Sequence, residues 1–254
     1  MRSGEPSPGL PSVYCFAHAG GNPREFLKWQ ADLAGQADLV AIAMPGRAHR
    51  FREAAPRDLD EYAGAAARAI AATAGDAPFY LFGHSLGALV AFEVARRLAG
   101  TTGLRHLIAS GSAAPSLLPS ERVKHAATLE GREFAEAIRF FGGLPTEVIG
   151  LEDLHALLLA NVQVDFRLVA SYRYRPAPPL PIGISLLNGA DDPHVSAAGL
   201  DPWSAESQLP VRQHWSPGGH FYFEDRPRAV CDLISEIVAG DAGAPPAGHT
   251  ELLI

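Results

Sequence analysis

The sequence predicts an α/β fold in which a mostly parallel central sheet is flanked by helices. The chain has 254 residues, of which 47% are hydrophobic and 19% are charged, which suits one globular domain and excludes general disorder. Short apolar runs rich in β-forming residues alternate with helical patterns along most of the chain. Because these runs are mostly continuous, both faces of each strand should be covered, as in a parallel sheet with right-handed crossovers.

Each expected strand is one short apolar run. The six runs cover residues 12–17, 37–43, 78–82, 104–110, 182–188 and 211–215. Helical patterns between and after them cover residues 23–35, 59–74, 86–99 and 226–239. In the last of these patterns the apolar residues fall on one stripe, which is typical of a helix that packs on a sheet.

The interval from 112 to 181 breaks this alternation, since it holds no convincing strand. It carries helical patterns near 130–141 and 152–170 and is too long for a structureless connection. We therefore expect a helical insertion above the carboxyl ends of the strands, where α/β proteins bind ligands. The single domain, 1–254, then has a core over about 10–111 and 182–240, an insertion over about 112–181, and a flexible tail over 241–254.

Composition excludes several classes of protein. The net charge of −7 argues against a general nucleic-acid binder. The N-terminal residues lack the apolar segment of a secretion signal, and no run approaches the length of about 18 apolar residues that suggests a membrane helix. Cys15 and Cys231 are too few for a disulfide framework or a thiolate metal site. We expect a cytoplasmic monomer that needs no metal and no cofactor.

The G-x-S-x-G pattern at 83–87 predicts a nucleophilic serine. The run FYLF before it favours a buried strand and LGALVAFEVARRLA after it a helix, so the pattern lies on a strand–turn–helix elbow. Such an elbow strains the backbone of Ser85, requires small neighbours and exposes the hydroxyl at the sheet edge. The alternative is a serine in an ordinary tight turn, since such strings also arise by chance.

A histidine base should follow Ser85, because a serine hydroxyl is a poor nucleophile until its proton is removed. In this architecture the chain order is serine, acid, histidine. His220 alone among the ten histidines combines that order with a flexible loop and a strand end. Its competitors are His214, within a strand, and His194, too close to the acid to bridge from it to Ser85. His84 is expected to be a packing or positioning residue.

The orienting acid should lie in the loop after residues 182–188, where Asp191 and Asp192 are adjacent. Both follow a strand end, so position alone leaves both open, and one of them would be a loop-capping carboxylate. A metal site formed by these acids with His194 and His220 is not favoured, because H-E-x-x-H and related spacings are absent.

An acyl-transfer site also needs hydrogen-bond donors where the oxyanion forms. One donor should be the backbone N–H of Leu86, which follows the nucleophile. The second should come from the glycine-rich loop at 18–22, and we assign it to the N–H of Ala19. This loop matches neither the G-x-x-x-x-G-K-[ST] nor the G-x-G-x-x-G pattern of phosphate-binding loops.

Six motifs in order resemble the type II thioesterases that accompany polyketide synthases and nonribosomal peptide synthetases. They are CFAHAGGN, MPGRAHRFRE, GHSLGA, the lid pair FGGLPTEV and DFRLVASYRYRPAPPL, GADDPHVS and PGGHFYF. The chain departs from the family at Ala17, where proline is common, and at Ala48, where an acidic or small residue often follows PGR.

The resemblance implies the α/β-hydrolase fold, with the helical insertion as a lid. It also implies hydrolysis of acyl groups from the phosphopantetheine arm of an acyl or peptidyl carrier protein, which clears aberrant or stalled acyl units. It aligns Asp192, three residues after Gly189, with the acid of the triad, and Asp191 is the fallback. The alternatives are a general carboxylesterase or lipase and a noncatalytic binding module. The triad alone does not separate a thioesterase from a carboxylesterase or lipase.

Two groups of residues are expected to contact the substrate. Those predicted to line an acyl chamber, or only to anchor the lid to the core, are Phe140, Phe141, Leu144, Val148 and Ile149. Those predicted to form a positive docking surface for an acidic carrier, or only a solvated loop face, are Arg47, Arg50 and Arg52, with Arg57 nearby. Lid motion is expected to gate access to the site.

Overall fold

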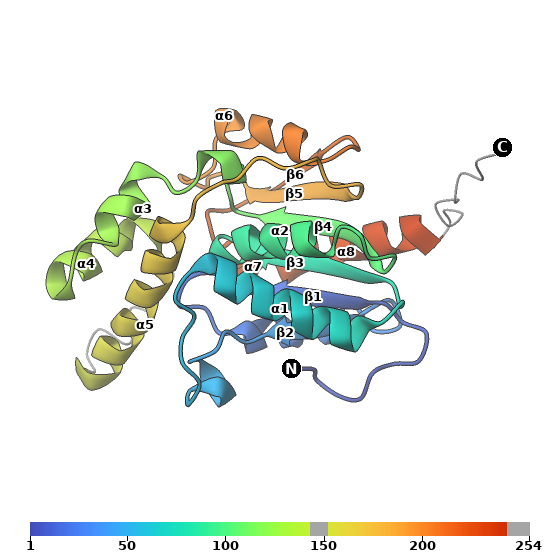
Figure 1. The fold of residues 1–254 in the computed structure, drawn as a ribbon, viewed down its shortest axis with the longest axis horizontal. Helices are drawn as coiled ribbons and strands as arrows, with labels where there is room; N and C mark the ends of the chain where they lie inside the picture. The colour runs from blue at the N-terminus through green and yellow to red at the C-terminus, as the bar shows by residue number, and fades with distance from the viewer. Residues whose placement is uncertain (143–151, 243–254) are drawn as a thin grey trace.

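A parallel sheet of six strands forms the centre of the protein (Figure 1). The computed structural model describes residues 1–142 and 152–242. The strands, each within two residues of its expected bounds, are β1 (Ser12–Phe16), β2 (Asp38–Ile42), β3 (Phe79–His84), β4 (Leu104–Ser110), β5 (Gly183–Gly189) and β6 (Arg212–Ser216). Their order is β2-β1-β3-β4-β5-β6, and every pair is parallel, which confirms the predicted fold class.

Helices cover both faces of the sheet. They include α1 (Leu59–Ala74), α2 (Leu86–Leu98) and, near the C-terminal end of the chain, α7 (Tyr222–Asp225) and α8 (Pro227–Ala242). The segment predicted as a helix over 23–35 is instead a 3₁₀ helix, η1 (Pro23–Ala31), followed by a turn in which Gly35 has a φ of 75°. Residues 243–254, most of the predicted flexible tail, lie outside the described residues.

Two apolar clusters account for the stability of this layered arrangement. Alternate residues of β1 point to opposite faces, as strand geometry requires. Tyr14 and Phe16 pack in the cluster with α1 and α2, whereas Val13 and Cys15 pack in the cluster with η1 and α8. Because both faces are buried, β1, β2, β3 and β5 are largely continuous apolar runs, whereas the edge strand β6 is mostly exposed and polar.

The interval between β4 and β5 is helical and lies beyond one end of the sheet (Figure 1). Its described elements are η3 (Pro115–Leu117), α3 (Glu121–Ala126), α4 (Gly131–Ile138), η4 (Arg139–Phe141) and α5 (Glu152–Ser171). The first of its α-helices, α3, was not predicted, because its six residues show too little periodicity. A small apolar cluster in which Phe134 meets Phe166 edge-to-face joins α4 to α5.

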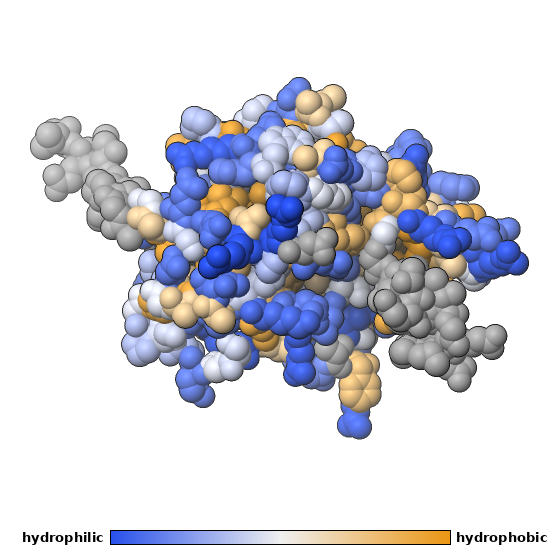
Figure 2. Space-filling model, turned by 180° about the vertical axis from the view of Figure 1, so that it is seen from behind, coloured by the Kyte–Doolittle hydropathy of each residue, from blue (hydrophilic) through white to orange (hydrophobic). Residues whose placement is uncertain are grey.

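A short helical segment also joins β5 to β6, made of α6 (Ala197–Leu200) and η6 (Asp201–Glu206). Its Trp203 is fully buried and donates a hydrogen bond from Nε1 to the carbonyl of Ser112 at 3.2 Å. Seen from behind, the surface is mainly hydrophilic with smaller hydrophobic areas (Figure 2). Within the described ranges, no helix has the length and apolar character needed to cross a membrane.

Candidate active site

Ser85 lies on the turn between β3 and α2 with φ of 56° and ψ of −117°. It is the one non-glycine residue with positive φ in the described part of the chain, a conformation that costs on the order of 1–3 kcal/mol. The backbone around this turn is packed so closely that Gly83 and Gly87 have no room for a side chain. A Cβ on Gly83 would lie 2.1 Å from the carbonyl oxygen of Gly87, and a Cβ on Gly87 would lie 2.1 Å from that of Phe16. Both glycines of the motif are therefore required by contact with backbone.

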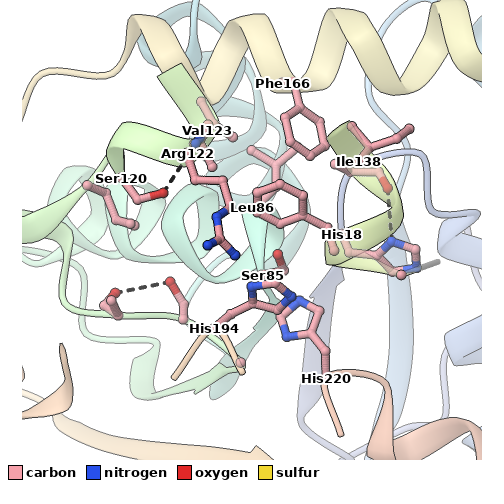
Figure 3. A pocket seen from close by; sticks show the side chains of 18 of the residues that line it. His18, Ser85, Leu86, Ser120, Arg122, Val123, Ile138, Phe166, His194 and His220 are labelled. Atoms are coloured by element: carbon pink, nitrogen blue, oxygen red, sulfur yellow. Dashed lines mark hydrogen bonds between the residues drawn. The ribbon is translucent and has the colours of Figure 1, made fainter. Parts of the chain in front are cut away.

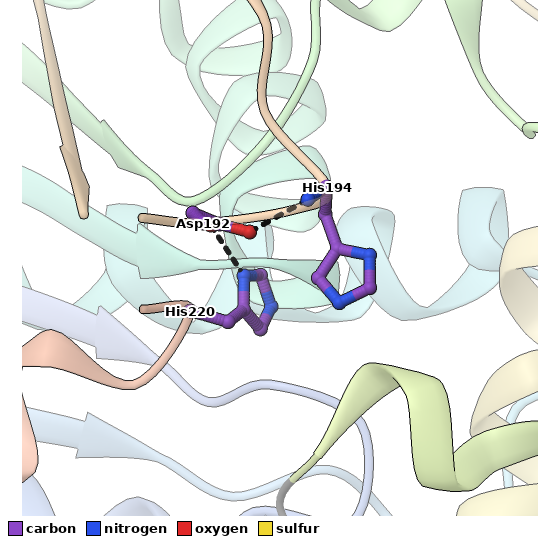
Figure 4. A group of neighbouring side chains, drawn as sticks. All are labelled: Asp192, His194 and His220. Carbon is purple, nitrogen blue, oxygen red and sulfur yellow. Dashed lines mark hydrogen bonds and ion pairs between the residues drawn. The ribbon is translucent and has the colours of Figure 1, made fainter. Parts of the chain in front are cut away.

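His220 and Asp192 meet at the carboxyl ends of β5 and β6 (Figure 4). His220 Nδ1 lies 2.7 Å from Asp192 Oδ2, and the side chains are 8% and 0% exposed. Asp191 is exposed and lies outside this contact; its backbone N–H donates to Gly218. The loops that carry Asp192 and His220 approach each other closely. A Cβ on Gly189 would therefore lie 2.1 Å from the carbonyl oxygen of Gly219.

His84 supports this pair from below. Its ring is fully buried, lies 4.7 Å from the His220 ring centroid and forms a 2.8 Å hydrogen bond between Nδ1 and Ser110 Oγ. Ser110 Oγ in turn lies 2.7 Å from the hydroxyl of Tyr222. Burial, with a smaller contribution from His220, lowers the pKa of His84 well below its usual 6.5. His84 is therefore a neutral packing residue, in agreement with its predicted role.

His194, considered from the sequence as a competitor of His220 for the base, lies beside His220 in the site. Its ring centroid lies 4.8 Å from that of His220, and the ring stacks on Phe141 at 5.0 Å. Its backbone N–H donates to Asp192 Oδ1 at 2.8 Å. Burial lowers the pKa of its imidazole, so it is neutral near pH 7. Its position two residues after the acid was the one available signal.

Asp192, His194 and His220 are a group of possible metal ligands, with one ligand atom of each within 4.8 Å of the others (Figure 4). Both oxygens of Asp192, however, already accept hydrogen bonds, Oδ2 from His220 and Oδ1 from the His194 backbone. The geometry is therefore accounted for by an acid that orients an imidazole.

The glycine-rich loop at 18–22 lies between Ser85 and the helical insertion. Ala19 and Leu86 both line the cavity that contains Ser85. The Gly20 N–H donates to Asp165 Oδ2 of α5 at 2.7 Å, and a Cβ on Gly20 would lie 2.5 Å from the side chain of Val162 on the same helix. The insertion thus fixes the loop that carries one of the two predicted oxyanion donors.

Arg47 completes this connection through contacts with two residues of α5. Its Nη2 lies 2.7 Å from Asp165 Oδ1 and 2.6 Å from the carbonyl oxygen of Asn161, and Nη1 contacts the Asn161 side chain. The Arg47 and Asp165 side chains are 16% and 3% exposed. The guanidinium of Arg47, predicted to face an acidic carrier or solvent, is thus occupied within the protein.

The other arginines of this stretch remain at the surface. Arg50 pairs with Glu53 and donates to the carbonyl of Ala43. Arg52 is exposed and lies over the ring of Phe51 at 5.4 Å. Arg57 pairs with Glu61.

A cavity of about 480 Å³ lies between the sheet edge and the insertion (Figure 3). Ser85, His194 and His220 lie together on one side of it, and Ile138 and Phe166 on the side of the insertion. Phe140 and Phe141, two of the residues predicted either to line an acyl chamber or to anchor the lid, also line this cavity, whereas Leu144, Val148 and Ile149 lie outside the described residues. The lining is mainly apolar, so the cavity suits an acyl chain next to a nucleophile.

The chain is similar to a known domain family and to proteins of known name. The thioesterase domain family matches residues 11–238. Thioesterase PikA5 of Streptomyces venezuelae is 31% identical, covering 92% of this chain and 83% of its own length. Linear gramicidin dehydrogenase LgrE of Brevibacillus parabrevis is 32% identical, covering 87% and 85%.

Solved structures agree in fold. The type II thioesterase BorB from the borrelidin biosynthetic cluster superposes with a TM-score of 0.83 at 33% identity, covering 94% of this chain and 96% of its own. YbtT, a type II thioesterase from the yersiniabactin NRPS/PKS pathway, gives 0.82 at 27% identity, covering 94% and 98%.

Proposed function

The chain belongs to the thioesterase family, and from that premise we propose that it hydrolyses acyl thioesters on the phosphopantetheine arm of an acyl or peptidyl carrier protein. It is a hydrolase that acts on thioester bonds, with the α/β-hydrolase fold. One observation carries the proposal: the strained Ser85 and the His220–Asp192 pair meet at an apolar cavity roofed by a helical insertion.

In the acylation step, His220 Nε2 takes the proton of the Ser85 hydroxyl as Oγ attacks the thioester carbonyl carbon. The tetrahedral intermediate then breaks its C–S bond, and His220 returns the proton to the leaving thiolate. In the deacylation step, water gives a proton to His220 and attacks the acyl-serine. The Ser85 oxygen takes that proton back as the carboxylic acid leaves.

Asp192 has two functions in this sequence. Because its Oδ2 accepts from Nδ1 of His220, Nε2 is the nitrogen left to act on Ser85, and the carboxylate stabilises the imidazolium that forms. The neighbouring His84 and His194 are neutral near pH 7, since burial lowers their pKa. They therefore add no positive charge beside the imidazolium.

The backbone N–H groups of Leu86 and Ala19 are assigned to the oxyanion. Leu86 is the first residue of α2, so the partial positive charge at that helix end adds to its N–H. Ala19 adjoins Gly20, whose N–H is held by Asp165 of α5. Loss of one such donor typically lowers kcat by about 10²–10³-fold.

We infer an editing role, which is the removal of aberrant or stalled acyl groups. The inference rests on the similarity to type II thioesterases that belong to biosynthetic pathways. Of the arginines predicted to contact the carrier, Arg52 is the one whose guanidinium makes no ion pair with any described residue. A positive contribution to carrier docking therefore falls to Arg52, beside the exposed Phe51.

The proposal is tested by offering the protein the same acyl group in three substrates. These are the thioester of a carrier protein, the thioester of N-acetylcysteamine and an oxygen ester. We expect the highest kcat/KM for the acyl-carrier protein. The Ser85→Ala variant, whose fold is checked by circular dichroism, should hydrolyse none of the three substrates. A preference for the oxygen ester would identify a carboxylesterase instead, and unchanged turnover by Ser85→Ala would remove Ser85 as nucleophile.

A further inference from the structure

Among the described residues that line the cavity next to Ser85, one cationic side chain forms no ion pair with a described carboxylate. Among the described residues that line it, Arg122 is the one lysine or arginine, and none is an aspartate or glutamate. Apart from the histidines and a few serine hydroxyls, the described lining is apolar. Arg122 itself is exposed, so its guanidinium is hydrated while it borders this apolar lining.

Arg122 lies in the first turn of α3, with its side chain directed into the cavity on the side of Ser85 and His194 (Figure 3). Its Cζ lies 3.6 Å from the centroid of the Phe140 ring. No described residue forms an ion pair or a side-chain hydrogen bond with it. The ring of Phe140 therefore holds one face of the guanidinium, and the N–H groups on its edge stay available to a ligand.

We propose that Arg122 binds a carboxylate carried by the acyl group, so that the cavity accepts half-thioesters of dicarboxylic acids as well as neutral acyl chains. This inference rests on the proposed thioesterase function and adds a substrate class to it. A carboxylate fits the free edge of a guanidinium through two parallel N–H···O bonds. The apolar lining then contacts the methylene groups between that carboxylate and the thioester.

The position of Arg122 favours the acyl group over the phosphate of the pantetheine arm as the source of the anion. Its charge is felt at His194, where it contributes to the lowered pKa of that imidazole. Arg122 and Ser85 line the same cavity, and the guanidinium is directed to the side that holds Ser85 and His194 (Figure 3). The phosphate lies at the far end of the pantetheine arm, away from the thioester.

The test compares Arg122→Met and Arg122→Lys with the unchanged protein on three probes. The probes are succinyl-N-acetylcysteamine, its uncharged methyl ester analogue, and the same uncharged acyl group on phosphopantetheine. We expect Arg122→Met to lower kcat/KM for the succinyl thioester about tenfold relative to the uncharged analogue, and Arg122→Lys to recover part of that loss. Arg132→Met is the matched control, because Arg132 is on the surface of α4 and pairs with Glu136. It should leave the ratio unchanged.

Each other outcome is decisive. An equal loss on the charged and uncharged N-acetylcysteamine thioesters would overturn the proposal, since Arg122 would then only support Phe140. A loss confined to the phosphopantetheine probe would assign Arg122 to the phosphate and likewise overturn it. Hydrolysis of the uncharged thioester by the unchanged protein keeps these results separate from a failure of the thioesterase function itself.

Discussion

Replacing Arg47 by methionine tests whether a buried ion pair holds the insertion and the oxyanion loop together. Asp165 of α5 is 3% exposed and accepts hydrogen bonds from Arg47 and from the Gly20 N–H. In Arg47→Met the carboxylate keeps only the backbone donor. Removing one partner of a buried pair typically costs about 3–5 kcal/mol, and the remaining Gly20 donor places this case near about 3 kcal/mol.

We expect the melting temperature to fall by about 6–12 °C, since a chain of this size loses about 2–4 °C per kcal/mol. Thermal and urea unfolding, followed by circular dichroism, measure both quantities. At a temperature well below the transition, kcat for a small neutral thioester should also fall, because the loop that carries Ala19 loses its anchor on α5.

The size of the effect should depend on pH. Burial raises the pKa of Asp165 above its ordinary value of 3.8, and Arg47 and the Gly20 N–H oppose that shift. A carboxyl group whose pKa is higher in the folded state destabilises the fold where it is ionised. Its penalty is therefore absent at low pH and grows as pH rises through the folded-state pKa. Loss of Arg47 raises this pKa further, so the deficit should be smaller at about pH 5 than at about pH 8.

Two comparisons decide the matter. Arg47→Met combined with Asp165→Asn should recover much of the lost stability, because the amide oxygen still accepts from Gly20 and no charge is buried. Arg57→Met, which breaks the exposed pair with Glu61, should leave the unfolding free energy unchanged. An Arg47→Met variant as stable as the unchanged protein, or a stability deficit that does not vary with pH, would show that this ion pair does not hold the insertion and the loop together.

Three further predictions follow from the site. Asp192→Asn should lower kcat by about 10⁴-fold, because the imidazole loses its oriented tautomer, while Asp191→Asn should be nearly unaffected in the same kinetic assay; the reverse ranking would move the role to Asp191. Gly87→Ala should prevent soluble folding, since its Cβ would lie 2.1 Å from a backbone carbonyl oxygen, and a stable, active variant would contradict this. Burial lowers the pKa of His18 to about 4 and that of His84 well below 6.5, so the unfolded chain takes up protons first on acidification. Urea titrations should therefore show stability that is complete above about pH 6.5 and falls as pH drops toward about 4; a flat profile over that range would count against it.

Local patterns were enough to predict the sheet and the strained turn at Ser85. All six strands lie within two residues of their expected bounds, and the inner strands were the clearest because buried parallel strands are continuous apolar runs. The elbow at Ser85 depends on Gly83 and Gly87, which are near neighbours in the chain, so the motif carries its own geometric requirement. The chain order of serine, acid and histidine then limited the partners of Ser85 to a few loop residues.

Only the tertiary structure decided which groups meet across long separations. Position after a strand end left Asp191 and Asp192 both open, and only the family resemblance favoured Asp192; the loop conformation brings the Asp192 carboxylate to His220 and leaves Asp191 exposed. Arg47 resembled a surface charge, because its partner Asp165 is 118 positions away. Arg122 lies in a helix too short to show periodicity, and its place in the cavity follows from how α3 packs on α5. Sequence patterns determine local geometry, whereas burial and pairing depend on neighbours that the fold alone brings together.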